Sequence, residues 1–266
     1  MAERVRSSII EVFFVMGLYG LLGKSLSHSF SKRYFEETHL FNTIAGSDQY
    51  ANFELSSIQD LNSILESNPD LEGFNVTIPF KSEIISYLDT LSEEAQTIGA
   101  VNVVKIIKSD GAKGITLQGY NTDHWGFIES IRPYLQPNYN KALILGTGGS
   151  SNAVCYALEN SGVSCLKVTR GDTKSGMINY LDLNDKIITE HLLIVNTTPL
   201  GTWPQTEMYP EIPFEFLTPG HLVFDLVYNP PMTLFMKKAM AYGARVMNGY
   251  EMLCLQADKS LLIWKS

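Results

Sequence analysis

The chain has 266 residues, of which 45% are hydrophobic and 18% are charged, and its formal net charge is -8. This length exceeds what one hydrophobic core usually supports, so two domains are expected. The composition is that of a globular protein rather than a disordered one. The negative charge argues against nucleic acid or a membrane as partner, because no basic stripe is present to neutralise phosphates. An anionic small-molecule substrate needs only a local basic or hydroxyl-rich pocket.

The first fifteen residues carry two arginines and an apolar patch. Glu11 interrupts this patch and no small-residue cleavage site follows it, so we do not expect a signal peptide. No apolar run is long enough to span a bilayer. Cys155, Cys165 and Cys254 are odd in number and unevenly spaced, which predicts buried reduced thiols rather than disulfides or a zinc site. We therefore expect a cytoplasmic protein that uses no metal.

The first half of the chain alternates strand and helix patterns up to about residue 120. Strands are predicted over 17–22, around Phe53 and over 73–78, and helices over 32–40, 57–66 and 81–88. Two further strands, over 100–108 and 114–119, flank Ser109-Asp110-Gly111, which is typical of a hairpin turn. The first half is therefore predicted to be an α/β unit.

A helix over 123–134 leads into a second unit. Strands are predicted there over 142–145, 165–169, 192–196, 222–226 and 245–247, with helical stretches between them. This alternation predicts a doubly wound parallel sheet with right-handed crossovers. The last helix, over 249–264, is expected to return to the first unit. The predicted domains are an N-terminal α/β substrate domain, residues 1–120 plus 249–266, and a Rossmann-like nucleotide domain, residues 121–248.

The segment 141–154 joins an apolar strand to a helix through Gly146, Gly148 and Gly149. Exposed N–H groups and the helix dipole favour an anion at such a turn, and glycine lets the backbone approach a phosphate closely. A tight structural turn is the alternative interpretation. The order of strand, glycines and helix favours a nucleotide.

The end of the second strand of such a fold contacts the adenosine ribose. An acidic residue there binds a free 2′-hydroxyl, whereas a basic residue accommodates a 2′-phosphate. This chain has Thr169-Arg170-Gly171, followed by Asp172 and Lys174. The pattern favours NADP over NAD, although Arg170 could also be an ordinary solvated charge.

Ser27, Ser29 and Ser31 alternate along an extended loop, which places their hydroxyls on one side. Such hydroxyls can bind a carboxylate or a polyol, but serines are also common in loops without a ligand. His28 lies between them and is expected to form hydrogen bonds within the loop or core rather than to catalyse.

Lys81 follows directly on a predicted strand that Pro79 ends. A lysine at a strand end beside a cleft can act as an acid or a base, but it needs a partner. Asp123 is the candidate, because its carboxylate could hold the ammonium and accept a substrate hydroxyl. The alternative is that Asp123 caps the helix that follows it, which Asn121 or Thr122 could do equally well.

Eight motifs in order make the chain similar to the shikimate dehydrogenase family from about Gly17 to its end. They are SHSFS, NVTIPFK, the triplet Ala100-Val101-Asn102, NTD at 121–123, GTGGSSNAV, NTTPLG at 196–201, DLVYNP at 225–230, and NGYEML with Gln256. Each motif alone is modestly specific, but their shared order is not expected by chance. The resemblance implies a reversible reduction of 3-dehydroshikimate to shikimate with NADP, in aromatic amino-acid (chorismate) biosynthesis, by a monomer or homodimer.

The resemblance also implies a role for each matching residue. Lys81 and Asp123 would be the catalytic pair. The substrate would be bound by Ser29, Ser31, Thr77, Asn102, Tyr228 and Gln256. The cofactor would be bound by Gly146, Gly148, Gly149 and Ala153 in the diphosphate loop, by Thr169, Arg170 and Lys174 around the phosphate, and by Gly249 near the nicotinamide.

Several positions depart from the family pattern, among them Thr169 and Gly171, which flank Arg170 where the family commonly reads Asn-Arg-Thr. Lys32 replaces a proline after the second serine, and Asn152 stands where the glycine loop commonly has a basic residue. Lys174 replaces an arginine, and a lysine cannot make the forked contact of a guanidinium. Two other functions therefore stay open, namely a quinate/shikimate dehydrogenase that uses NAD or both cofactors, and a nucleotide-binding sensor without catalysis. A folate-linked dehydrogenase is disfavoured by the serine pair and Gln256.

Overall fold

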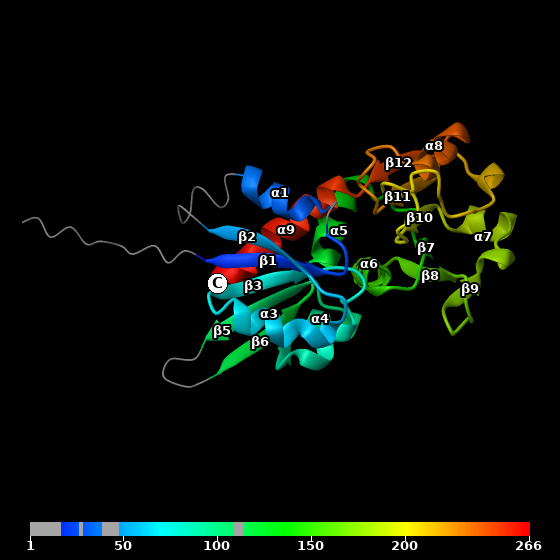
Figure 1. Cartoon of the computed structure of the whole chain (residues 1–266). Helices are drawn as coiled ribbons and strands as arrows, with labels where there is room; N and C mark the ends of the chain where they lie inside the picture. Colours follow the sequence, from blue (N-terminus) through cyan, green and yellow to red (C-terminus); the bar gives the residue numbers. More distant parts are fainter. Residues whose placement is uncertain (1–16, 27–28, 39–47, 109–113) are drawn as a thin grey trace, which may run out of the picture.

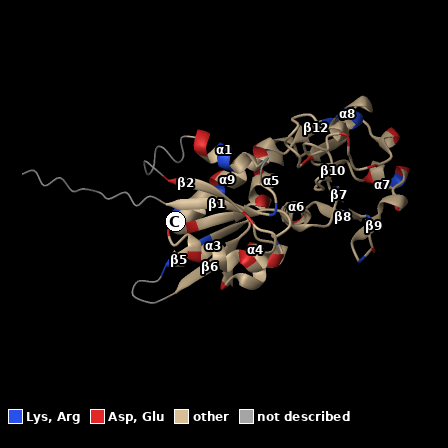
Figure 2. Ribbon diagram, in the orientation of Figure 1, with Lys and Arg blue, Asp and Glu red and all other residues tan. Residues whose placement is uncertain are grey.

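The computed structural model describes residues 17–26, 29–38, 48–108 and 114–266. Within these ranges the strands form two six-stranded sheets, which lie side by side in Figure 1. The two-domain α/β prediction is confirmed at this level. Basic and acidic residues are interspersed over both halves (Figure 2), so an anionic ligand would be bound by local groups rather than by a broad basic surface.

The first sheet has the order β2-β1-β3-β5-β6-β4. Its strands are β1 (Leu18–Gly23), β2 (Gln49–Glu54), β3 (Leu71–Val76), β4 (Thr90–Leu91), β5 (Val103–Lys108) and β6 (Ile115–Tyr120). β1 is parallel to β2 and β3, whereas β5 is antiparallel to both β3 and β6. The helices of this half are α1 (Phe30–Glu37), α3 (Leu61–Ser67) and α4 (Glu93–Ile98).

The second sheet has the order β12-β11-β10-β7-β8-β9, and all its pairings are parallel. Its strands are β7 (Lys141–Leu145), β8 (Ser164–Thr169), β9 (Met177–Asn179), β10 (Leu193–Asn196), β11 (Leu222–Asp225) and β12 (Arg245–Asn248). Its helices are α5 (Asp123–Ile131), α6 (Gly149–Glu159), α7 (Asp185–Glu190) and α8 (Leu234–Ala241). Counted from β7, the order is the 3-2-1-4-5-6 arrangement of dinucleotide-binding folds, which reverses direction between β7 and β10.

The last helix, α9 (Tyr250–Lys265), returns to the first sheet. Figure 1 shows it in red beside the blue and cyan strands, with the C-terminus next to β3. Trp264 near its end stacks on Tyr19 at 4.8 Å between ring centroids, and its indole Nε1 donates a 3.0 Å hydrogen bond to the Val104 carbonyl. The last seventeen residues therefore complete the core of the first half.

Most of the predicted elements are present within a few residues, and the differences have physical causes. The predicted helix over 81–88 is a shorter 3₁₀ helix, Glu83–Tyr87, and α1 begins at Phe30 because Ser29 caps it. β4, α4 and β9 were not predicted, since two to six residues carry too little periodicity. The hairpin turn at 109–111 and the first sixteen residues lie outside the described residues.

The three cysteines are free thiols. Cys155 is buried as expected, but Cys165 and Cys254 are partly exposed, so the prediction of burial is wrong for these two. In the part of the chain that the structure describes, no helix combines the length and apolar character that a membrane crossing requires.

The packing of Trp264 makes α9 important for stability. Trp264→Ala should lower the free energy of unfolding by about 3–5 kcal/mol, because it removes a buried aromatic ring and leaves a cavity. Urea unfolding would measure this. Leu262→Ala is the matched control on the same helix, since Leu262 is 63% exposed and should change stability little. Equal effects of the two changes would show that α9 is not anchored in this way.

Candidate active site

A cleft of about 510 Å³ lies at the point where the strand order of the second sheet reverses. Its walls are the glycine loop after β7, the ends of β8 and β10 with the residues that follow them, and the segment after β3. Ligands of open α/β sheets bind at this position, beyond the carboxyl ends of the strands. Of the predicted site residues, the lining includes Lys81, Gly146, Gly148, Gly149, Thr169 and Arg170.

The glycine loop has the backbone that the predicted function requires. Gly146 has a φ of +119°, which side chains with a Cβ rarely adopt. Gly148 is the N-cap residue of α6, and a Cβ added to it would meet nothing within 4 Å, so it faces open space. The N-terminus of an eleven-residue helix therefore points its N–H groups into the cleft, which is favourable for a phosphate group.

Lys81 and Asp123 meet beside this loop. The Lys81 ammonium donates to Asp123 Oδ2 at 2.5 Å and lies 3.4 Å from Ser150 Oγ, in the first turn of α6 next to the glycine loop. The two charged side chains are only 15% and 7% exposed. A Cβ on Gly149 would lie 3.4 Å from the Lys81 Cβ, so the loop packs directly against the lysine. The pair predicted from the sequence is therefore in contact and lies at the glycine-lined cleft.

Asp123 does not act through its side chain as a helix cap. It is the first residue of α5, where Asn121 Oδ1 instead accepts a hydrogen bond from the His124 N–H at 3.3 Å. The second carboxylate oxygen of Asp123 accepts from Asn102 Nδ2 at 3.0 Å. A carboxylate at the start of a helix is also stabilised by the helix dipole.

Asn102 brings together residues from three parts of the chain. Its Nδ2 also lies 3.2 Å from Gln256 Oε1 on α9, and its Oδ1 accepts from the Thr122 N–H at 2.6 Å. Asn102 and Gln256 are both buried. Asn102, Asp123 and Gln256 therefore form one connected polar centre next to Lys81.

Ser29 and Ser31 lie at the start of α1, on the side that faces the second half. Ser29 caps the helix, since its Oγ accepts from the Ser31 N–H at 3.3 Å. Phe30 between them contacts the Tyr228 ring edge-on at 6.0 Å, and burial raises the pKa of Tyr228. Tyr228 is therefore brought from the loop after β11 to the serine pair. Ser27 and His28 lie outside the described residues.

A chain of buried hydrogen bonds runs from Tyr50, close to Ser31, to the polar centre, and sequence reasoning missed it as part of the site. The Ser31 side chain lies near the Tyr50 hydroxyl, which donates to Asn75 Oδ1 at 2.8 Å. Asn75 Nδ2 donates to Ser260 Oγ at 3.0 Å and to the Asn102 carbonyl at 3.2 Å. The only signal in the sequence was the alternation of Asn75 and Thr77 along β3. Thr77 follows β3 directly and is half-buried.

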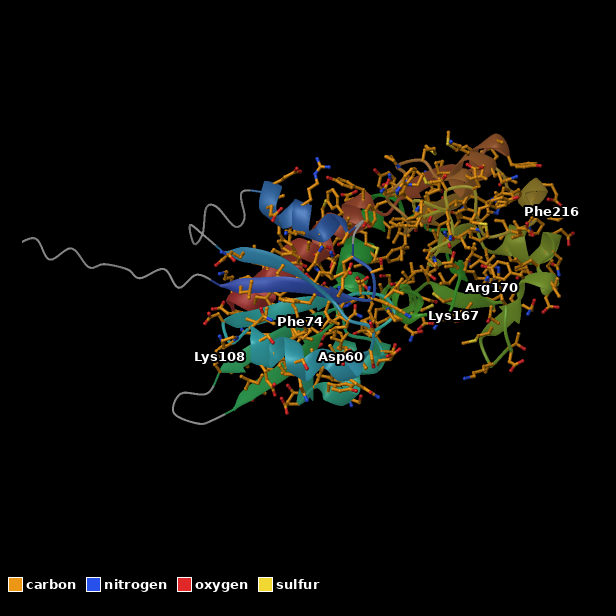
Figure 3. The ribbon with its side chains drawn as sticks, viewed as in Figure 1. Asp60, Phe74, Lys108, Lys167, Arg170 and Phe216 are labelled. Carbon is orange, nitrogen blue, oxygen red and sulfur yellow. The ribbon has the colours of Figure 1, made fainter. Side chains whose placement is uncertain are left out.

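Some of the remaining predicted cofactor residues line the cleft and others do not. Thr169 and Arg170 line the cleft at the end of β8, and Arg170 is labelled in Figure 3. Lys174 is exposed and does not line the cleft. Ala153 is fully buried against Ile98 and Ala100, so its small side chain allows the two halves to pack closely.

Gly249 and Asn152, the residue in the glycine-loop motif that departs from the family pattern, each have close neighbours that explain the residue type. A Cβ on Gly249 would lie 2.1 Å from the Leu226 carbonyl oxygen, so no side chain fits there. Asn152 accepts a 2.7 Å hydrogen bond from Lys167 Nζ and donates one of 3.0 Å to the Ile98 carbonyl. Lys167 (Figure 3), on β8, is therefore the basic partner of Asn152, and it lies outside the cleft lining. The described residues hold no cluster of three or more side chains suited to a metal ion.

Comparisons with known proteins agree with this geometry. A family model described as the shikimate dehydrogenase substrate binding domain matches residues 21–104. The shikimate dehydrogenase (NADP(+)) of Methanococcus maripaludis is 36% identical over 263 residues, which cover 93% of this chain and 90% of the relative. The chain belongs to the shikimate dehydrogenase family.

Solved structures of this family extend the likeness over both sheets. Shikimate 5-dehydrogenase from Thermus thermophilus, in complex with NADP(H) and shikimate, is 29% identical with a TM-score of 0.79. The alignment covers 94% of this chain and 93% of that one. A quinate dehydrogenase from Corynebacterium glutamicum, in complex with NAD, is 27% identical with a TM-score of 0.77 and the same coverage. Fold similarity alone therefore does not separate the two substrates or the two cofactors.

Asp225, in the DLVYNP motif of the family, makes part of the stability depend on pH. It is fully buried, and burial raises its pKa from 3.8 to about 6, although Thr233, Val227 and Asn196 all donate hydrogen bonds to it. Between about pH 4 and pH 6 the folded chain therefore holds a proton that the unfolded chain has released. The resulting contribution to stability is fully present below about pH 4 and is lost as pH rises through about 6, by about 3 kcal/mol for a shift of about two units.

Asp225→Asn should remove this dependence. We expect the wild-type free energy of unfolding minus that of the variant to fall between about pH 4 and pH 7, because only the wild type loses a buried proton. Urea unfolding at several pH values would measure the difference. The same series for Glu215→Gln, at an exposed carboxylate, controls for the substitution. A constant difference for Asp225→Asn would contradict the raised pKa.

Proposed function

We propose that this chain catalyses the reversible reduction of 3-dehydroshikimate to shikimate with NADP, as its relatives' names indicate for them. The observation that carries the proposal is the Lys81–Asp123 pair at 2.5 Å, next to the glycine loop and the Asn102–Gln256 centre. Family membership, with 30–36% identity to relatives named shikimate dehydrogenase (NADP(+)), supports it. A catalytically silent nucleotide sensor would not require this paired, nearly buried charge.

The cleft suits a dinucleotide with a 2′-phosphate. Open space in front of Gly148 and the α6 N-terminus would hold the diphosphate, with Gly146 and Gly149 beside it. Thr169 and Arg170 would meet the ribose 2′-phosphate, and Gly249 would leave room near the nicotinamide. When bound, the cofactor supplies the hydride for the reaction.

The chain's own residues would bind the substrate and move the proton. Lys81 holds a proton at Nζ where the carbonyl oxygen becomes an alkoxide, and Asp123 fixes the direction of that ammonium. Asn102 holds Asp123 through its other oxygen. In the direction of shikimate oxidation, the same pair accepts the proton.

Specificity would come from groups that a wrong substrate leaves unpaired. Ser29 and Ser31 would bind the carboxylate, Thr77 the carboxylate edge or a ring hydroxyl, and Asn102 and Gln256 ring hydroxyls. Tyr228 would close this side from the second half. Buried polar groups reject an analogue that lacks the matching hydroxyl, because those groups then lose their partner.

The domain division that fits this function places the substrate groups in residues 1–120 and 249–266, and the cofactor groups in residues 121–248. Support comes from α9, which packs on the first sheet, and from the glycine loop on the second. With the family's biosynthetic role, we propose that the protein works in the cytoplasm in aromatic amino-acid biosynthesis, as a monomer or homodimer.

The direct test is a comparison of four reactions, shikimate or quinate with NADP or NAD, followed by absorbance of the reduced nicotinamide. We expect the highest kcat/KM with shikimate and NADP, because Arg170 at the β8 end favours a 2′-phosphate. A preference for quinate with NAD would instead support the function of the Corynebacterium glutamicum relative. No turnover with any pair would favour a nucleotide sensor.

Lys81→Ala tests the mechanism. We expect kcat with shikimate to fall by about 10²- to 10⁴-fold, because proton transfer loses its acid and base, while the Kd for NADP changes little. Lys237→Ala, at an exposed lysine of α8, is the control and should retain wild-type kcat. Because Asp123 is left unpaired, circular dichroism must show that the variant is folded. Unchanged turnover in a folded Lys81→Ala variant would remove Lys81 from the mechanism.

A further inference from the structure

The short strand β9 places an additional side chain at the cleft. β9 pairs with β8 so that Asn179 lies opposite Thr169, and the next residue, Tyr180, begins a 3₁₀ helix. Asn179 caps this helix through the Leu181 N–H at 3.1 Å, and its Nδ2 lies 3.4 Å from the Gly171 carbonyl. The position of Tyr180 next to the Thr169–Gly171 segment is therefore fixed by backbone pairing and by a capped turn.

Tyr180 turns inward, whereas its neighbour turns outward. Tyr180 lines the cleft together with Thr169 and Arg170, whereas Leu181 is 93% exposed. The Tyr180 hydroxyl is shielded from solvent, yet among the described residues it has no hydrogen-bond partner. A buried hydroxyl without a partner is unfavourable, which calls for an acceptor that the free chain does not supply.

The charge state of the surrounding groups defines that acceptor. Burial raises the pKa of Tyr180 to about 12, with Arg170 opposing the rise, so the hydroxyl keeps its proton at neutral pH and can donate it. Arg170 is exposed and forms no ion pair with the described residues. A donor hydroxyl and an unpaired guanidinium on one wall are complementary to an oxyanion.

We infer that Tyr180 is a specificity residue that donates a hydrogen bond to the adenosine 2′-phosphate of NADP, beside Arg170, which binds the same phosphate. The inference rests on the proposed function only for the identity of the cofactor. It assigns part of the phosphate recognition to the 3₁₀ helix after β9, in place of Lys174, which lies outside the cleft lining. A free ribose hydroxyl, as in NAD, offers a weaker neutral acceptor, so Tyr180 favours NADP.

Two nucleotide fragments test this without turnover. Adenosine 2′,5′-bisphosphate carries the 2′-phosphate and adenosine 5′-monophosphate lacks it, and isothermal titration calorimetry would give the Kd of each. For Tyr180→Phe we expect the affinity for the bisphosphate to fall by about 10-fold, the loss of one hydrogen bond to a charged group, and that for the monophosphate to stay unchanged. Arg170→Ala is the positive control and should lower the same affinity.

If the Tyr180 hydroxyl had a purely structural role, Tyr180→Phe would lower Tm. Because the hydroxyl has no partner in the free chain, we expect Tyr180→Phe instead to leave Tm unchanged or raise it. Tyr209→Phe, outside the cleft lining, is the matched control and should alter neither affinity. Equal loss for both fragments, no loss for either, or a wild type that does not prefer the bisphosphate would overturn the inference. Turnover of shikimate by the wild type tests the proposed function separately, so either can fail alone.

Discussion

The ion pair between Lys81 and Asp123 is the constraint on which the rest of the site depends. Two opposite charges that are nearly shielded from water are tolerated only when each is held by its partner and by further hydrogen bonds. Asn102 supplies one of these for the carboxylate, and Ser150 lies within reach of the ammonium. Since Ser150 lies in the first turn of α6, directly after the glycine loop, the pair ties the polar centre of the first sheet to the anion-binding edge of the second.

The packing of the two halves protects this arrangement. Each sheet has its own apolar clusters, and a small cluster of Ile98, Ala100 and Ala153 joins them behind the ion pair. Gly149 packs against Lys81 and Ala100 in the same region, where a larger residue would push the loop away. Small side chains at the junction therefore set the distance between the lysine and the loop, which proton and hydride transfer both require to be short.

Much of this could be predicted from the sequence because the signals were local. Buried parallel strands appear as apolar runs, the glycine loop follows one of them, and Lys81 and Asp123 stand a few residues after strand ends. The relay through Tyr50, Asn75 and Ser260 could not be predicted, since its members are far apart in the sequence and meet only through sheet pairing and the return of α9. Tyr180 was missed because β9 has three residues and no pattern of its own. Ala153 and Lys174 show that a matching motif position does not by itself place a side chain in the cleft.

The return of α9 has a consequence for the order in which the protein matures. On the ribosome, the strands of the first sheet emerge early, but Gln256, Ser260 and Trp264 belong to its polar and apolar interior and emerge last. The nascent N-terminal half must therefore wait, with an uncovered sheet face, while the whole second half is translated and folds. Only the final turns of the last helix then complete the older half, so its native packing requires the C-terminal end of the chain.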